Sequence, residues 1–315
     1  MSFAKLINDI FNDYTIRTVT LGSGILGIIS GVIGSFAVLR KQSLLGDTIS
    51  HAALPGIALA FILTGFKSQI IFILGALIAG WIATVFFISI TSFSKIKTDS
   101  AMGIILSSFF GLGIVLLTYI QKKPTASQAG IEKFLFGQAA AIVTSDLIIM
   151  SIFGGVGIIL LVLFWKEFKI STFDPGFAHS SGYNVKNLNS ILTGLIVIAI
   201  VVGLQTVGVV LMSAMIALPG AAARQWTDRL GMMVILAGLF GAAAGISGAL
   251  ISAYSGKLPT GPLIIIIISL LVLISILFAP DRGIVYKAIR MAGSKTKLKT
   301  DGILLTLFEL AMQHK

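Results

Sequence analysis

Long apolar runs follow one another along most of the chain, and each run has about the length of one membrane crossing. About 20 apolar residues cross the hydrocarbon core of a bilayer as a helix. Polar segments separate the runs and are mostly short, so the runs are predicted to be consecutive spanning helices. Nine runs show this pattern: residues 18–39, 46–65, 69–91, 101–120, 146–165, 189–204, 206–224, 230–256 and 261–279.

Two of the nine runs are weaker than the others, which makes eight spans the alternative count. Residues 189–204 form a short run, and residues 206–224 are rich in glycine and alanine. Residues 131–143 are apolar but too short to cross, so we expect them to lie at the interface or to re-enter the membrane. The chain is therefore predicted to consist of a transmembrane domain, 1–280, and a polar tail, 281–315.

The composition agrees with this pattern. Hydrophobic residues make up 56% of the 315 residues and charged residues 11%, whereas a soluble domain has about 25% charged residues. The mean hydropathy of +1.02 excludes a soluble globular enzyme, a disordered chain and a disulfide-rich secreted module. Only helices and closed barrels span lipid. The long continuous runs favour helices, since barrel strands alternate at short intervals. The predicted fold is an all-α polytopic membrane protein.

Basic residues are unevenly shared between the two sets of loops. With nine spans, sixteen of the 23 Lys and Arg residues lie on one side, in loops 40–41, 95–97, 166–186 and 224–229 and in the tail. Cytoplasmic loops carry the excess of Lys and Arg, which predicts an N-terminus outside and a C-terminus in the cytoplasm. This asymmetry and the lipid headgroups account for the net charge of +11 without a nucleic-acid partner.

The tail contains an amphipathic segment. Its apolar positions recur at helical spacing, which predicts a cytoplasmic helix docked on lipid or on a partner. The positions are Ile303, Leu304, Leu307, Leu310 and Ala311. The segment ahead of it holds Lys295, Lys297 and Lys299, which suit either a regulatory contact or binding to an anionic membrane surface.

Asp47 and His51 are the outstanding ionisable residues within the predicted spans. Charge within the hydrocarbon layer is costly, so such residues are functional candidates. The spacing of four places both side chains on one helix face. A carboxylate oxygen beside an imidazole nitrogen suits manganese, iron or zinc better than calcium or magnesium. The alternative roles are structural: Asp47 as the cap of the second span, and His51 as a hydrogen-bonded core histidine.

Two prolines add to the candidate path. Pro55 lacks an N–H, so the carbonyl of His51 loses its helical partner and becomes a further candidate oxygen ligand or water anchor. Pro219 frees the carbonyl of Met215 in the same way. Residues 53–56 and 217–220 share the sequence Ala-Leu-Pro-Gly, which is consistent with an internal repeat of the kind that transporters carry near their pathway. Met215 itself is also accounted for by packing alone.

The sequence lacks the motifs of several enzyme classes. The sequence has no GxxxxGK[ST] phosphate loop, no HExxH and no GxSxG, so neither a P-loop ATPase nor an intramembrane hydrolase is predicted. It also has no cysteine, which excludes thiolate metal sites. The chain is therefore not expected to be an enzyme.

Several ordered motifs over residues 17–285 resemble the membrane permease subunits of metal-type ABC importers, which take up manganese, zinc or iron. The first runs from Arg40-Lys41 through Gly46-Asp47 and Ser50-His51-Ala52 to Leu54-Pro55-Gly56. The others are residues 98–104, Phe134-Leu135-Phe136-Gly137, Val207-Gly208-Val209 with residues 218–224, and Leu258-Pro259-Thr260-Gly261-Pro262. Because the motifs occur in one order, they are more specific than a lone short pattern.

The resemblance implies a type II importer fold in a bacterial cell membrane, with broken helices lining the path. It implies two copies of this chain, a cytoplasmic ATPase subunit that alone binds ATP, and an extracellular metal-binding lipoprotein. It places Asp47 and His51 on the metal path. It also gives one cytoplasmic segment the role of coupling to the ATPase, through Phe173, Asp174, Pro175, Phe177, Ala178 and Gly182. Pro175 after Asp174 suits a capped helix start, which an ordinary loop helix would share.

We therefore predict the transmembrane subunit of an ATP-driven importer of a divalent transition metal, with manganese first and then zinc or iron. The metal is cargo, and no covalently bound cofactor is expected. The first alternative is a proton-coupled secondary metal transporter, with Asp47 and His51 as a proton relay. The second is a type II permease for an organic metal chelate, which would need a wider and less charged path.

Overall fold

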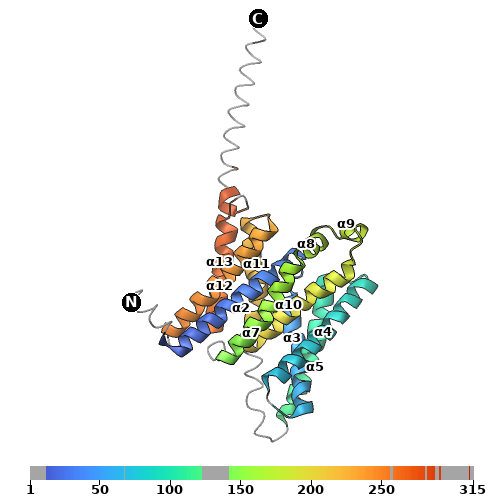
Figure 1. Ribbon diagram of the computed structural model, residues 1–315, viewed down its shortest axis with the longest axis vertical. Helices are drawn as coiled ribbons and strands as arrows, with labels where there is room; N and C mark the ends of the chain where they lie inside the picture. Colours follow the sequence, from blue (N-terminus) through green and yellow to red (C-terminus); the bar gives the residue numbers. More distant parts are fainter. Residues whose placement is uncertain are drawn as a thin grey trace.

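The fold is known from a computed structural model, which describes residues 12–66, 68–122, 142–255, 258–280 and 282–287 together with residues 291 and 312. This part of the chain is helical and contains no strand (Figure 1). Its helices are α2 (Tyr14–Leu39), α3 (Leu45–Thr64), α4 (Gln69–Phe93), α5 (Thr98–Gln121), α7 (Thr144–Leu163), α8 (Trp165–Phe173), α9 (Pro175–Ser180), α10 (Val185–Val207), α11 (Val209–Trp226), α12 (Leu230–Ser255) and α13 (Thr260–Phe278).

Eight of the described helices are long and apolar enough to cross a membrane, which confirms the all-helical membrane fold. They correspond to eight of the nine predicted runs. The ninth run is α11, which has 18 residues and ends at Arg224, Gln225 and Trp226. Helix α11 is not among the eight candidates found in the described residues, although its length lies within the range of about 17–25 residues that crossing helices have.

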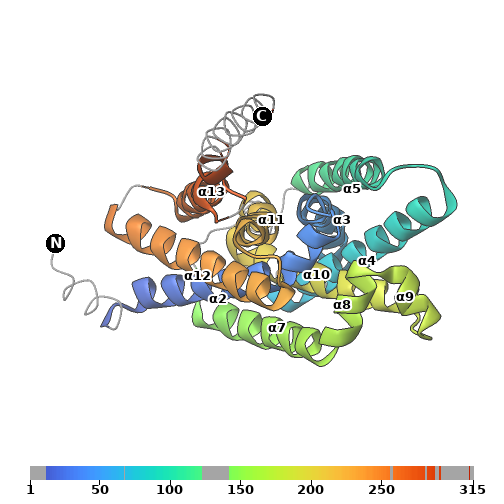
Figure 2. The ribbon, with the colours of Figure 1, turned by 90° about the horizontal axis from the view of Figure 1, so that it is seen from above.

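Helices α2 and α12 lie side by side (Figure 2). Small residues at spacings of four let their backbones approach closely. A Cβ added to Gly27 would lie 2.2 Å from the carbonyl oxygen of Gly241, and one added to Gly245 would lie 2.2 Å from that of Ser23. No other residue fits at these positions without moving a helix.

Two groups of helices lie on opposite sides of the molecule (Figure 2). Helix α3 packs against α4 and α5 on one side, and α11 packs against α12 and α13 on the other. Helix α11 also contacts the start of α3, because Gly46 lies against the backbone of Ser213. The two helices that carry the Ala-Leu-Pro-Gly sequence are therefore neighbours. Each runs unbroken through its proline, whereas the chain is interrupted at Gly208, between α10 and α11.

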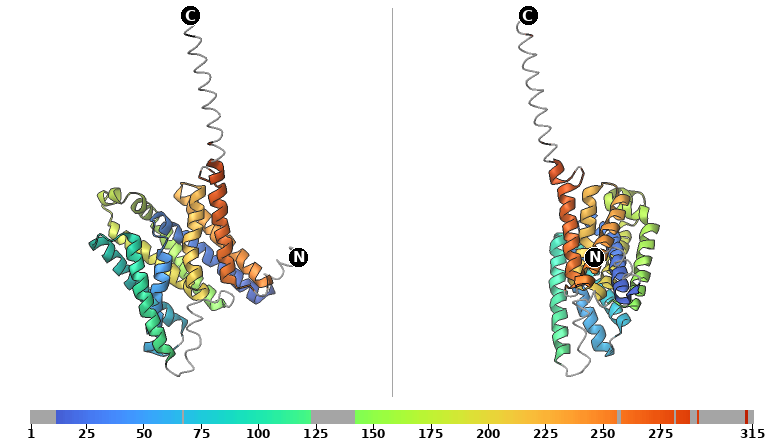
Figure 3. Two further views of the ribbon diagram at one scale, coloured as in Figure 1. Left: turned by 180° about the vertical axis from the view of Figure 1, so that it is seen from behind. Right: turned by 90° about the vertical axis from the view of Figure 1, so that its left-hand side faces the viewer.

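The short helices α8 and α9 lie at the end of the bundle where α13 also ends (Figures 1 and 3). Helix α8 packs on the last turns of α2 through aromatic rings. The ring of Phe36 meets those of Trp165 and Phe168 edge-on at centroid distances of 5.9 and 6.3 Å. Phe36 and Phe168 are fully buried, so α8 belongs to the packed core and is not a loose connection.

Two expectations from the sequence lie outside the described residues. The predicted interfacial segment falls almost wholly within residues 123–141, which include Phe134-Leu135-Phe136-Gly137. The amphipathic stretch of the tail falls within residues 292–315, of which only residue 312 is described. Both stay predictions.

Candidate metal site and coupling segment

Helix α3 brings Asp47 and His51 together on one face. The helix is preceded by Leu44, whose side chain makes no capping hydrogen bond, and Asp47 lies within the first turn. Asp47 is therefore not the N-cap residue, although a carboxylate there suits the positive end of the helix dipole. Its Oδ1 atom lies 3.4 Å from Nε2 of His51. The spacing of four therefore produces the contact that the sequence predicts.

The Asp47–His51 pair is partly exposed and partly enclosed by apolar side chains. The side chain of Asp47 is 42% exposed and that of His51 is 24% exposed. The ring of His51 meets Phe110 of α5 edge-on, with a centroid distance of 4.8 Å. Its Nδ1 atom is buried without a hydrogen-bond partner in the described part of the chain. The structural alternative, a core histidine with its polar atoms satisfied, does not fit this environment.

The pair can hold a divalent cation only in part. Asp47 Oδ1 and His51 Nε2 face one another and could share one ion. Among the described residues, no group of three His, Asp, Glu or Cys side chains could hold a metal. Manganese takes about six ligands and zinc about four. Within the described part of the chain, the two side chains alone are therefore too few for a complete ligand set of either metal.

The three candidate path residues are packed within the chain. Pro55 and Pro219 are buried in α3 and α11, and Met215 is 1% exposed within the hydrophobic core. Helix α11 does reach the start of α3, since Gly46 lies against Ser213 and Ile216. Met215 is enclosed by the side chains of its own chain, and its place on the path stays a prediction.

The predicted coupling segment has the local structure that its sequence indicates. Helix α9 begins at Pro175, and the Asp174 carboxylate accepts a hydrogen bond of 2.9 Å from the backbone N–H of Phe177. The capped helix start is therefore confirmed. Helix α8, which fills most of the polar stretch ahead of it, was not predicted.

The segment presents aromatic side chains on its surface. Phe173 is 52% exposed and Phe177 is 58% exposed, whereas Ala178 is buried. Gly182 ends the segment with a φ of 87°, a left-handed conformation that favours glycine. The segment thus exposes two phenylalanines, one at the end of α8 and one within α9.

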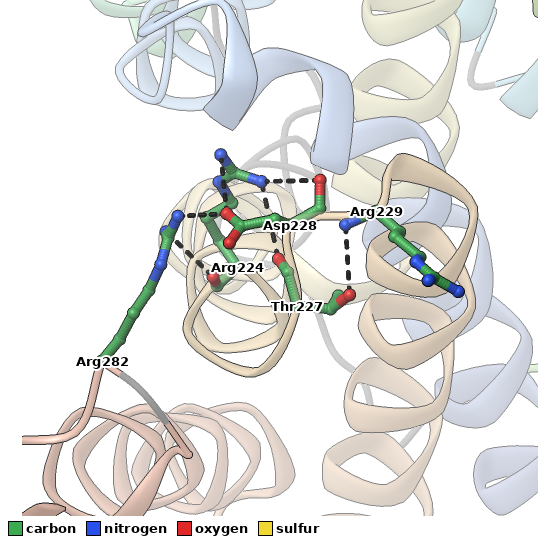
Figure 4. Close-up of polar contacts among 5 residues, drawn as sticks. All are labelled: Arg224, Thr227, Asp228, Arg229 and Arg282. Atoms are coloured by element: carbon green, nitrogen blue, oxygen red, sulfur yellow. Dashed lines mark hydrogen bonds and ion pairs between the residues drawn. The ribbon is translucent and has the colours of Figure 1, made fainter.

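Arg224, Asp228 and Arg282 form a cluster of charged side chains that was not singled out from the sequence (Figure 4). Asp228 Oδ1 lies 3.4 Å from Nη2 of Arg224 and also contacts the guanidinium of Arg282. Arg282 further donates a hydrogen bond of 3.3 Å to the backbone carbonyl of Arg224. The Arg224–Asp228 spacing of four was a signal for half of this cluster. Arg282 is far away along the chain, so nothing local in the sequence pointed to it.

Comparison with known proteins decides the family. The model of the ABC 3 transport family matches residues 12–279. The chain belongs to the ABC 3 transport family. This confirms the resemblance that the ordered motifs indicated, and with it a multi-pass membrane protein.

Several relatives resemble the chain over most of its length. It is 48% identical over 278 residues to the zinc transport system membrane protein TroC of Treponema pallidum, covering 88% of this chain and 93% of that protein. It is 48% identical over 291 residues to the manganese transport system membrane protein MntC of Bacillus subtilis, covering 92% and 67%. A solved structure, PsaBC from Streptococcus pneumoniae in complex with Fab, is 33% identical, with a TM-score of 0.77 and coverage of 89% and 98%.

Proposed function

We propose that this ABC 3 family chain is the transmembrane subunit of an ATP-driven importer, and that its cargo is a divalent transition metal, manganese first and zinc second. The observation that carries the proposal is the Asp47–His51 pair, a 3.4 Å oxygen–nitrogen contact in a membrane helix. Relatives of similar identity are named for manganese and for zinc transport. Iron remains the third candidate. The chain does no chemistry, and a separate cytoplasmic subunit binds and hydrolyses ATP.

The incomplete ligand set suits cargo better than a resident ion. A transport site must bind strongly enough to replace part of the hydration shell and weakly enough to release the ion. A carboxylate and an imidazole on one helix face meet this requirement, and a second copy of the chain around the same path would add a second pair. A neutral imidazole carries its proton on one ring nitrogen only, so Nε2 of His51 can present a lone pair to a metal in the tautomer that has the proton on Nδ1.

The remaining parts of the proposal concern partners and orientation. Metal arrives from an extracellular binding lipoprotein, and Phe173 and Phe177 of the α8–α9 segment dock on the ATPase. The C-terminus lies in the cytoplasm and the N-terminus outside, as the distribution of Lys and Arg favours. In support, α9 and the end of α13 lie at one end of the bundle (Figure 3). Arg224, Arg282 and Arg40 also belong to the loops assigned to the cytoplasmic side.

Metal uptake tests the proposal directly. Cells expressing the chain with its ATPase and binding-protein subunits are loaded with manganese, zinc or iron, and the accumulated metal is measured at matched membrane expression. We expect Asp47→Asn and His51→Ala to reduce uptake of one metal more than about tenfold, because even outer-shell partners of a metal site contribute 10- to 100-fold. Asp228→Asn is the matched control, since Asp228 makes a contact of the same spacing and distance outside the path.

Each outcome separates the alternatives. Uptake that survives both substitutions would overturn the site. Uptake that needs a proton gradient but no ATPase subunit would support the secondary transporter. Uptake of a metal chelate in place of the bare ion would support the chelate permease.

A further inference from the structure

Arg40 connects three elements at the point where α2 ends. It follows the last residue of α2, and its Nη2 atom donates to Oδ1 of Asn189 in α10. Its Nε atom donates to Oγ1 of Thr172, 3.4 Å away, in the last turn of α8. Thr172 directly precedes Phe173, the first residue of the predicted coupling segment. Arg40 therefore joins the entry to the metal helix with the segment that faces the ATPase.

The guanidinium is held there as a cation. Burial lowers the pKa of Arg40 to about 10, which leaves it protonated at neutral pH. Its partners Thr172 and Asn189 are neutral, and no described carboxylate lies within ion-pair distance of it. The C-terminal ends of α2 and α8 meet at this point, and the negative ends of helix dipoles favour a cation. The site thus uses the charge and the forked shape of arginine together.

Backbone hydrogen bonds fix the short segment between Arg40 and Asp47. Lys41, with a φ of 57°, donates to the carbonyl of Val38 at 3.0 Å, and Gln42 donates to that of Ala37 at 2.9 Å. This pair of bonds is the Schellman motif that ends many helices. Leu45, the first residue of α3, then donates to the carbonyl of Gln42 at 3.0 Å. Asp47 follows two residues later.

We propose that Arg40 is a positioning residue which ties the start of α3 to the α8–α9 segment, so that displacement of this segment is passed to the Asp47–His51 pair. The proposal rests on the proposed function, because it assigns the α8–α9 segment to the ATPase and the pair to the metal. Arg40 touches no cargo. It acts through Thr172 and Asn189, and the packing of Phe36 on Phe168 supports the same junction.

The ratio of metal transported to ATP hydrolysed tests this role. The complete transporter is reconstituted in liposomes with metal-loaded binding protein, and both rates are measured for Arg40→Gln, Asn189→Ala and the double variant. Substitutions within a coupling network change coupling by 0.5–2 kcal/mol, or roughly two- to thirtyfold. We expect Arg40→Gln to lower the ratio by this amount while ATP hydrolysis stays within about twofold of wild type. The double variant should be no worse than Arg40→Gln alone.

Two controls keep the test sharp. Lys41→Asn removes the neighbouring exposed cation and suits the left-handed backbone, so its ratio should equal that of wild type. Arg40→Lys keeps the charge without the fork, and it replaces Arg40→Gln if that variant does not assemble. An unchanged ratio, or a parallel loss of both rates with additive effects, would overturn the role of Arg40. A wild-type transporter that moves no metal would instead overturn the proposed function.

Discussion

Helices α3 and α11 share a four-residue sequence, and a similar polar contact lies near one end of each. The two contacts differ in their surroundings. Both helices contain Ala-Leu-Pro-Gly, and each has a polar contact of 3.4 Å between residues four apart, within α3 in one case and between α11 and the turn after it in the other. In α3 the pair is Asp47–His51, ahead of the proline and beside Phe110. At the end of α11 it is Arg224–Asp228, after the proline, where the side chain of Asp228 is 72% exposed and Arg282 joins it.

The difference teaches that spacing alone does not define a site. Exposed ion pairs contribute about 0–1 kcal/mol, because water screens them and their side chains lose freedom. The Arg224–Asp228–Arg282 cluster is of this kind and serves to hold the end of α13 near the α11–α12 turn. The Asp47–His51 pair has one buried nitrogen without a partner and too few ligands for a metal. These are the features on which the proposed cargo site rests.

The glycines that follow the two prolines differ in how tightly they are packed. A Cβ on Gly56 would lie 2.1 Å from the carbonyl oxygen of Gly75, whereas one on Gly220 would lie 3.1 Å from a methyl group of Val38. We expect Gly56→Ala to lower the free energy of unfolding by about 3 kcal/mol and Gly220→Ala by about 1 kcal/mol or less. Thermal unfolding of the purified protein in detergent measures both. Equal losses would contradict the account of α3 packing.

The residues with a positive φ that precede the two helices also differ. Gly208 precedes α11 with φ 82° and ψ 172°, a region open almost only to glycine, so Gly208→Ala should lower the free energy of unfolding by about 1–3 kcal/mol.

Lys41, ahead of α3, has a φ of 57° that glycine adopts more readily. Lys41→Gly should therefore raise the unfolding free energy by up to about 1 kcal/mol. The same unfolding assay tests both, and a stability loss in Lys41→Gly would refute the assigned turn.

The exposed cluster should give the smallest effect. Asp228→Asn removes the charge that Arg224 and Arg282 share, and we expect a loss of no more than about 1 kcal/mol. Because salt screens exposed charges, the difference between variant and wild type should shrink in about 1 M salt. A large loss that persists in high salt would show that the cluster is more than a surface contact.

Most of the helices could be predicted from the apolar runs, because a spanning helix must be continuously apolar. The ends could be predicted less well, since they depend on caps. Helix α2 begins at Tyr14, where the Asp13 side chain accepts from the N–H groups of Thr15 and Ile16, and α10 begins at Val185 behind an Asn184 cap. These polar caps precede the apolar runs and lie outside the hydrophobic signal.

The site could be predicted where it is local and not where it is assembled from distant segments. Asp47 and His51 meet because a helix brings positions four apart together, and Asp174 caps α9 for a similarly local reason. The contacts of Arg40 with Thr172 and Asn189 join residues more than 130 positions apart. Only the packing of α2 on α8 and α10 creates them, so no periodicity could indicate them.

Pulsed electron paramagnetic resonance of manganese trapped in the assembled, hydrolysis-deficient transporter tests the central claim most directly. An imidazole ligand couples its nitrogen nucleus to the bound ion. We predict nitrogen coupling in the wild type, its loss in His51→Gln, and its retention in His179→Gln, which removes an exposed histidine of α9. Bound manganese without nitrogen coupling in the wild type, or coupling that persists in His51→Gln, would contradict the assignment of His51 as a metal ligand.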